Sequence, residues 1–137
     1  MAAPRILLVD DEQEFLRRVM LQLEDEFEVV GTSADGARAV ALTWKLSPDV
    51  VVMDISMPVT NGIEAARCLR ELGSRSRVVF LTVNADRDFV DAALSAGGVG
   101  YVLKTRLLTD LIPSIWSALE GTLFISPPLR SAGPRSC

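Results

Sequence analysis

The chain has 137 residues, of which 49% are hydrophobic and 23% charged, with a net charge of −4 and no histidine. This length fits one domain with a buried core, and the composition excludes a disordered chain. The acidic balance gives no general attraction to nucleic acid or anionic lipid, and the lack of histidine excludes His-based catalytic triads and His-ligated metal sites.

Strand and helix patterns alternate five times along the chain. Short runs of apolar, mostly β-branched residues predict strands at residues 5–10, 27–33, 49–55, 77–83 and 100–104. Apolar residues at helical spacing predict helices over residues 15–23, 37–44 and 62–72, from Asn84 or Asp86 to Gly97, and over 108–119. In the last helix we expect Asp110 to be the cap, which would place Pro113 in the first turn, where its missing N–H is harmless.

This alternation predicts an α/β fold. Right-handed crossovers would give a single doubly wound, five-stranded parallel sheet with five helices covering its two faces. We expect this domain to span residues 1–122, and residues 123–137, rich in Pro, Ser and Gly, to be a linker or disordered tail. Trp44 is expected in the core. Trp116 lies just off the apolar stripe of the last helix and is a candidate contact for a homodimer through that helical face.

The N-terminus and the cysteines indicate the compartment. The apolar run before Asp10 is only four residues long, too short for a signal peptide or a membrane span, so we expect a cytoplasmic protein with no membrane partner. The two cysteines, Cys68 and Cys137, do not make a disulfide framework.

Charged or hydroxyl side chains end four of the predicted strands. The first strand ends on Asp10-Asp11, the third on Asp54, the fourth on Thr82 and the fifth on Lys104. Because ligands bind at the carboxyl ends of parallel strands, we expect these side chains to meet at one edge of the sheet. Three clustered carboxylates repel one another, and a hard divalent cation such as Mg²⁺, which prefers oxygen ligands, relieves that repulsion.

The chemistry that this arrangement favours is phosphoryl transfer. An aspartate at the end of a buried strand beside a metal ion is rigid and partly desolvated, so Asp54 is the candidate nucleophile. Lys104 would neutralise the oxygens of the transferred group, and Thr82 would donate a hydrogen bond to one of them.

The segments LLVDDE, VVVMDISMPVTNG, FLTV and GYVLK resemble the receiver domain of bacterial two-component response regulators, over residues 5 to about 122. The resemblance implies a flavodoxin-like sheet in the order 2-1-3-4-5. It also implies that Asp54 accepts a phosphoryl group from the phosphohistidine of a sensor histidine kinase, or from a small acyl phosphate. Asp11 would bind Mg²⁺ directly and Asp10 through water, with the backbone carbonyl of Ser56 as a further ligand.

The resemblance further implies a conformational switch. Thr82 would move toward the phosphoryl group and Tyr101 would turn into the vacated space, so that a population shift controls the output. Pro58 and Gly62 match the loop that follows the acceptor. The ending ALEGTLFISPPL resembles the subgroup in which a helix-turn-helix domain follows the receiver. The expected output is then transcription, with DNA bound only by a domain that this chain lacks, and the chain is either an excised receiver or a stand-alone protein.

One departure from the family and two rival functions stay open. Many receivers carry a cis proline after the lysine, but this sequence has Thr105, so that geometry is not carried over. A receiver is a signalling switch that catalyses only its own phosphorylation and slow dephosphorylation. One rival is an aspartyl-phosphate phosphohydrolase, but such enzymes resemble Asp-x-Asp, and Ser56 stands two positions after Asp54. The other is a degenerate receiver that only binds partners, and the retained site residues argue against it.

Overall fold

A computed structural model describes residues 2–57, 60–83 and 86–130 of the chain, and it contains one parallel sheet in the order β2-β1-β3-β4-β5-β6. The strands are β1 (Arg5–Val9), β2 (Glu28–Ser33), β3 (Val50–Asp54), β4 (Arg77–Thr82), β5 (Gly100–Leu103) and β6 (Phe124–Ile125). The helices are α1 (Gln13–Leu23), α2 (Gly36–Leu46), α3 (Gly62–Glu71), α4 (Arg87–Ser95), α5 (Leu107–Leu119) and α6 (Pro127–Arg130), with a 3₁₀ turn at Lys104–Arg106. The flavodoxin-like order of the first five strands is confirmed.

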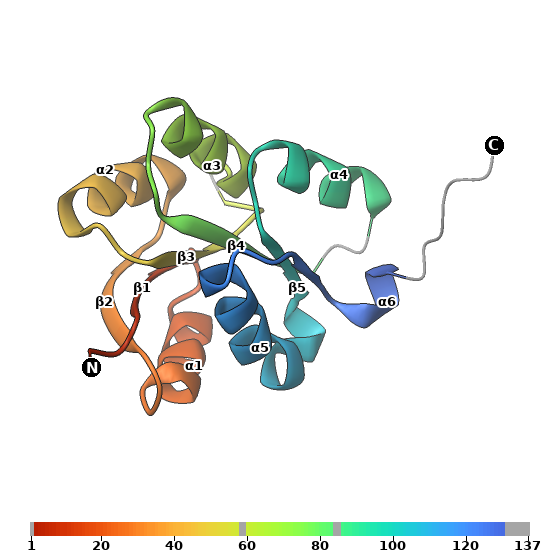
Figure 1. Cartoon of the computed structure of the whole chain (residues 1–137), viewed down its shortest axis with the longest axis horizontal. Coiled ribbons are helices and arrows are strands. Elements are labelled where there is room, and N and C mark those ends of the chain that lie inside the picture. The colour runs from red at the N-terminus through yellow and green to blue at the C-terminus, as the bar shows by residue number, and fades with distance from the viewer. Residues whose placement is uncertain (1, 58–59, 84–85, 131–137) are drawn as a thin grey trace.

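Helices cover both faces of the sheet (Figure 1). Helices α2, α3 and α4 lie on one face, and α1 and α5 on the other. Successive residues of a strand point to opposite faces, so each strand contributes to two cores. Leu7, Met53 and Phe80 belong to the core under α2, α3 and α4, whereas Leu8 and Val52 belong to the core under α1 and α5. This is why the central strands are apolar on consecutive residues.

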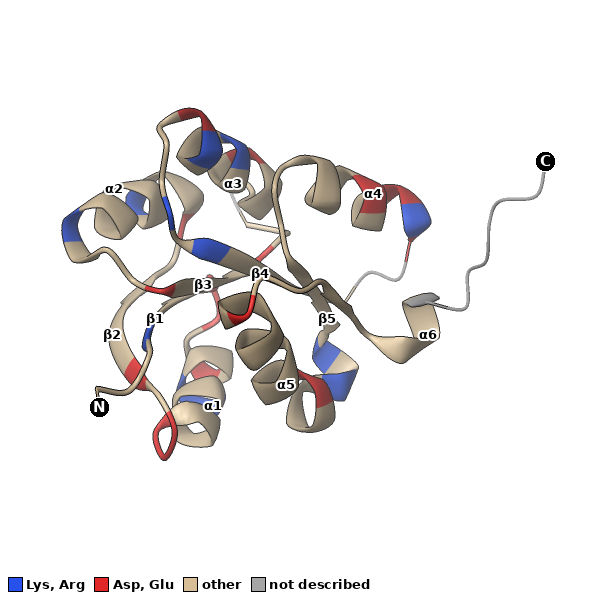
Figure 2. Ribbon diagram, viewed as in Figure 1, with Lys and Arg blue, Asp and Glu red and all other residues tan. Residues whose placement is uncertain are grey.

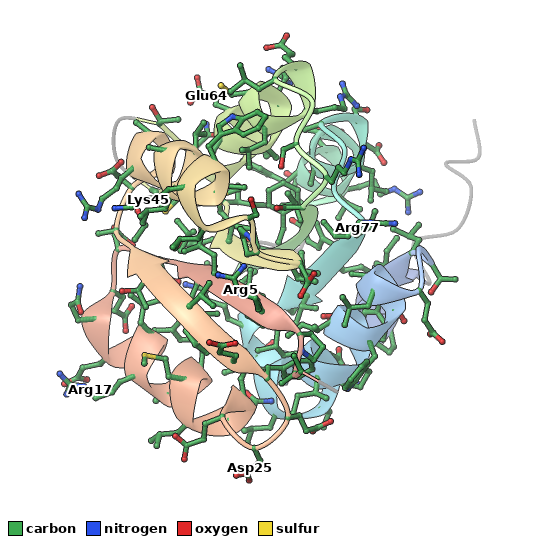
Figure 3. All side chains as sticks on the ribbon, turned by 60° about the vertical axis from the view of Figure 1, so that its left-hand side comes forward. Arg5, Arg17, Asp25, Lys45, Glu64 and Arg77 are labelled. Atoms are coloured by element: carbon green, nitrogen blue, oxygen red, sulfur yellow. The ribbon has the colours of Figure 1, made fainter. Side chains whose placement is uncertain are left out.

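Charged residues lie mainly on the helices and connecting segments around a largely uncharged sheet (Figure 2). The side chains of Arg17, Asp25, Lys45 and Glu64 stand at the periphery of the molecule (Figure 3). Within the described residues, no helix combines the length and the apolar character that crossing a bilayer would need.

The sheet contains one strand more than the sequence predicts. Residues 123–137 were expected as linker or tail, but β6 pairs with β5, through hydrogen bonds from Phe124 N to Val99 O (3.1 Å) and from Ser126 N to Tyr101 O (2.9 Å). Helix α6 follows, and Leu129 is buried in the core under α2, α3 and α4. The expectation was wrong for residues 124–130 because a run of three apolar residues, 123–125, next to Ser and Pro is too short a signal for a strand.

Two helices differ in detail from the predictions. Helix α5 already begins at Leu107, so Pro113 lies inside the helix, and Asp110 is a buried residue of its first turn and not its cap. Helix α2 turns its small residues Ala39 and Thr43 inward, which leaves Trp44 51% exposed and not in the core.

Candidate functional site

The register of the sheet gathers the ends of the central strands at one edge. Val9 pairs with Met53, Asp54 with Leu81, and Thr82 with Leu103. Because all these strands are parallel, the residues that end or directly follow them lie at the same edge of the sheet.

Three carboxylates meet at this edge. Asp10, Asp11 and Asp54 each offer an oxygen atom, and these atoms all lie within 4.8 Å of one another. Asp10 and Asp54 are only 1% and 5% exposed, whereas Asp11 is open to solvent. Two of the three charges are therefore largely removed from water, and the third leaves the cluster accessible from outside.

Lys104 is the counter-charge. Its Nζ donates to Asp10 Oδ2 at 2.7 Å and lies 3.5 Å from Asp54 Oδ2. Burial acts to lower the pKa of Lys104, but the hydrogen bond to Asp10 and the charge of Asp54 outweigh it and hold this pKa above its ordinary value. The ammonium also lies 4.3 Å from the centre of the Phe15 ring, a cation–π contact.

Asp54 has an unusual protonation equilibrium for a carboxylic acid. Burial, together with the nearby charge of Asp10, raises its pKa from 3.8 to about 6, against the attraction of Lys104. The Ser56 N–H donates to Asp54 Oδ1 at 3.3 Å, and the Glu12 N–H donates to Asp10 Oδ1 at 2.9 Å. A carboxylate that is costly to ionise is one that gains from a cation or from a covalent bond that disperses its charge.

Thr82 and Tyr101 lie next to each other on β4 and β5, and both are buried. Burial raises the pKa of Tyr101 to about 12, although a side-chain hydrogen bond with Thr82 acts to lower it. Tyr101 is 0% exposed, so in this structure the ring already occupies the inward position, with the Thr82 hydroxyl engaged with the phenol.

The loop after β3 approaches the acceptor strand closely. A Cβ atom at Gly62 would collide with the carbonyl oxygen of Asp54, and the Gly62 N–H donates to Ile55 O at 2.9 Å. Asn61 starts α3 with a capping box shared with Glu64. Gly62 is thus required by close packing and not by a positive φ. Pro58 lies outside the described residues.

The bond after Lys104 is trans, as are the other peptide bonds of the described residues. Lys104, Thr105 and Arg106 form a 3₁₀ turn that leads into α5. The peptide bond between Lys104 and Thr105 therefore does not have the cis geometry that many receivers have at this position.

Sequence reasoning missed some residues around the site. Phe15 is the first apolar residue of the helix predicted over residues 15–23, and its ring also contacts the ammonium of Lys104. Asp110 and Ser126 hydrogen-bond to each other at 2.8 Å near the end of β5. No sequence signal pointed to either role, because both depend on contacts between distant segments.

The donor set fits a hard cation. Asp10, Asp11 and Asp54 provide only carboxylate oxygens, the ligands that Mg²⁺ and Ca²⁺ prefer, and a divalent charge would offset the cost of ionising Asp54.

Comparisons with known proteins agree with this geometry. Residues 6–115 match the family described as response regulator receiver domain. Transcriptional regulatory protein DegU of Brevibacillus brevis is 38% identical over 125 residues, which is 90% of this chain and 53% of that protein. Transcriptional regulatory protein DesR of Bacillus subtilis is 36% identical over 126 residues, covering 90% of this chain and 62% of that protein.

A solved structure shows the same likeness in three dimensions. The two-component response regulator of the LuxR family from Aurantimonas sp. SI85-9A1 has a TM-score of 0.86 and 33% identity, with 94% of each chain covered. This chain spans 53–64% of the length of the first curated relatives it matches. By sequence, fold and site geometry, the chain belongs to the receiver domain family of two-component response regulators.

Proposed function

We propose that Asp54 is the phosphoacceptor of this receiver domain. The observation that carries the proposal is the convergence of Asp10, Asp11 and Asp54 within 4.8 Å, with Lys104 bridging two of them. Asp54 ends a buried strand, and its backbone is held by the pairing of Asp54 with Leu81 on one side and of Met53 with Val9 on the other.

The transfer step is a displacement at phosphorus. A carboxylate oxygen of Asp54 forms the new bond to phosphorus as the bond between phosphorus and the donor's ring-protonated phosphohistidine nitrogen breaks. The imidazole leaves as a neutral ring, taking the bonding electron pair and keeping the proton on its other nitrogen. Lys104 offsets the charge of the phosphoryl oxygens, and the Thr82 hydroxyl donates to one of them. With acetyl phosphate, the same attack releases acetate.

Mg²⁺ is the proposed cofactor. Asp11 and Asp54 would hold it directly and Asp10 through water, with the backbone carbonyl of Ser56 as a further ligand, and when bound it would neutralise charge on the phosphoryl oxygens. Hydrolysis of the product, by attack of water on phosphorus with Asp54 as the leaving carboxylate, resets the domain. The chain thus acts on itself, as a signalling switch and not as an enzyme with a separate substrate.

The switch follows from competition for one hydroxyl. Thr82 now hydrogen-bonds with Tyr101, and a phosphoryl group on Asp54 offers it a charged acceptor, which makes a stronger hydrogen bond. Moving Thr82 releases the phenol and changes the balance between two arrangements of β4, β5 and the segment that follows β4.

We infer a sensor histidine kinase as the phosphoryl donor, because the family belongs to two-component signalling. The names of the relatives describe transcriptional regulatory proteins, and transcription is the output we propose, with DNA bound by residues outside this chain. The homodimer stays a prediction. The Trp116 ring is 40% exposed. It also packs on the Phe27 ring, with 5.1 Å between ring centroids, and its Nε1 donates to Glu26 at 3.1 Å, so part of its surface is already used within the chain.

The direct test is phosphorylation by acetyl phosphate with Mg²⁺, read by intact mass. We expect one phosphoryl group on the native chain, none on Asp54→Asn, and strong inhibition by a chelator. Labelling that persists in Asp54→Asn would reject the assignment. Sustained turnover of a generic phosphomonoester would favour the hydrolase instead.

A further inference from the structure

Ser126, at the end of β6, connects three segments of the chain. Its backbone N–H donates to Tyr101 O at 2.9 Å, and its Oγ accepts a hydrogen bond from Leu103 N at 3.0 Å. The same hydroxyl donates to Asp110 Oδ2 at 2.8 Å. Ser126 is 0% exposed, so these bonds form away from competing water.

The Ser126 hydroxyl accepts the hydrogen bond of the Leu103 N–H in place of a backbone carbonyl. Leu103 is the last residue of β5, and in a longer parallel ladder a carbonyl of the neighbouring strand would accept its N–H. Here the chain turns into α6 at Pro127, so the ladder stops and the Ser126 hydroxyl accepts instead. Without it, a buried N–H would be left without a partner.

Asp110 links Ser126 to Arg106, at the end of the turn that carries Lys104. Its carboxylate is 4% exposed and accepts from Arg106 Nε at 2.8 Å and from Thr109 Oγ1 at 3.0 Å, in addition to Ser126. Burial acts to raise the pKa of Asp110, but the hydrogen bonds from Arg106, Ser126 and Thr109 outweigh it and keep this pKa below its ordinary value. The carboxylate therefore stays ionised and accepts all three bonds at neutral pH.

Leu103 and Arg106, which hydrogen-bond to Ser126 and Asp110, lie on either side of Lys104 in the sequence. Leu103 directly precedes Lys104, and Arg106 follows two positions later, so the backbone that carries Lys104 is tied down on both sides. Lys104 extends from this short turn to Asp10 and Asp54. Ser126 lies outside residues 6–115, which match the family, so the connection comes from a segment beyond the matched part.

We propose that Ser126 and Asp110 are positioning residues for phosphoryl transfer, which fix the turn that carries Lys104 and so aim its ammonium at the phosphoryl group. The inference rests on the proposed function of Asp54. The C-terminal segment that leads out of the domain is thereby part of the phosphorylation site's support, although none of its residues touches the reacting atoms.

The test is a double-mutant cycle on the initial rate of phosphorylation by acetyl phosphate. Ser126→Ala should lower the rate about tenfold, since small misplacements of a catalytic group cost one to two orders of magnitude. In a Lys104→Met background, the same Ser126→Ala change should leave the residual rate unchanged, because there is no ammonium left to position. An equal fold loss in both backgrounds would overturn the proposal, as would a normal rate in Ser126→Ala.

Ser114→Ala is the matched control. The Ser114 hydroxyl is also buried, but it donates to Leu111 O at 2.7 Å within α5 and not to the turn at Lys104. This variant should keep the native rate. If it slows phosphorylation as much as Ser126→Ala does, loss of any buried hydroxyl suffices and the positioning role is refuted.

A second variant keeps the test decisive if Ser126→Ala folds poorly, and a second measurement checks the bond to Leu103 if it folds. Arg106→Met removes the partly exposed ion pair between Arg106 and Asp110. This change should slow phosphorylation in the native background but not in the Lys104→Met background. Amide hydrogen exchange at Leu103 should accelerate in Ser126→Ala and not in Ser114→Ala. If the native chain itself is not labelled, the proposed function fails; if it is labelled and the cycle shows no coupling, only the positioning role fails.

Discussion

Removing the charge of Asp54 should stabilise the protein when no divalent cation is present. In the folded chain the pKa of Asp54 is about 6, raised chiefly by burial, against an ordinary value of 3.8. A carboxyl group whose pKa is raised on folding favours the folded state at low pH, and that contribution is lost as pH rises from about 4 through 6. Above pH 6 the ionised carboxylate therefore opposes folding.

The size of this effect follows from the difference in pKa. A tenfold change in proton affinity is worth about 1.4 kcal/mol, so the rise from 3.8 to about 6 sets an upper limit of about 3 kcal/mol at pH 7. The site opens to solvent beside Asp11, and water there screens part of the cost, which leaves about 1–2 kcal/mol. Asn has the same shape and no charge, so Asp54→Asn should gain this amount.

The assay is urea unfolding of the native chain and Asp54→Asn with a chelator, at pH 7 and at pH 4.5. The gain should be about 1–2 kcal/mol at pH 7 and much smaller at pH 4.5. Asp25→Asn is the control, because Asp25 is exposed at the turn between α1 and β2 (Figure 3), and it should change little at either pH. Millimolar Mg²⁺ should stabilise the native chain and so reduce the difference in unfolding free energy between it and Asp54→Asn. An Asp54→Asn variant no more stable than the native chain at pH 7, or a gain independent of pH, would refute the reasoning.

Three further predictions test other parts of the site. Gly62→Ala should destabilise the fold by about 1–3 kcal/mol and slow phosphorylation, because its Cβ would collide with the Asp54 carbonyl, as chemical unfolding and acetyl phosphate labelling would show. Lys104→Met should slow labelling by about two to three orders of magnitude, with Mg²⁺ binding retained, and a rate near native would contradict its role. Tyr101 is the only tyrosine of the sequence, so an ultraviolet titration should find its phenol ionising near pH 12 in the folded chain and near 10 in denaturant. Because the phenol pKa is raised on folding, stability should fall as pH rises above 10, and Tyr101→Phe should flatten that fall.

The strands and the positions of the site residues were predictable from the sequence because both depend on local pattern. A strand covered on both faces must be apolar on consecutive residues, so the charge of Asp54 marks the end of its strand. Parallel pairing then brings such ends together whatever the details of packing, as the register of Asp54 and Leu81 shows.

The predictions failed where a residue's role depends on partners distant in sequence. Trp44 has an apolar side chain at a helical spacing typical of the core, but Ala39 and Thr43 are the residues that allow α2 to approach the sheet. Asp110 has the chemistry of a helix cap, and its carboxylate instead bonds Ser126, sixteen positions away. Phe124 and Ile125 form a strand only because β5 presents an edge for them, which no local pattern encodes.

Strand β6 also determines how this sheet meets other molecules. It is only two residues long, and Pro127 and Pro128 follow it after Ser126, so the backbone there has few N–H groups to offer a strand from another chain. The edge strand β6 is thus poorly suited to pair with another strand, and β2 is the edge strand on the opposite side of the sheet. Growth of a sheet by addition of strands from other chains needs two open edges, so a sheet with only one open edge can pair with a second copy but does not extend further. Truncation of the chain after Leu123 would remove β6 and expose the edge of β5. Self-association of this truncated chain should then increase with protein concentration.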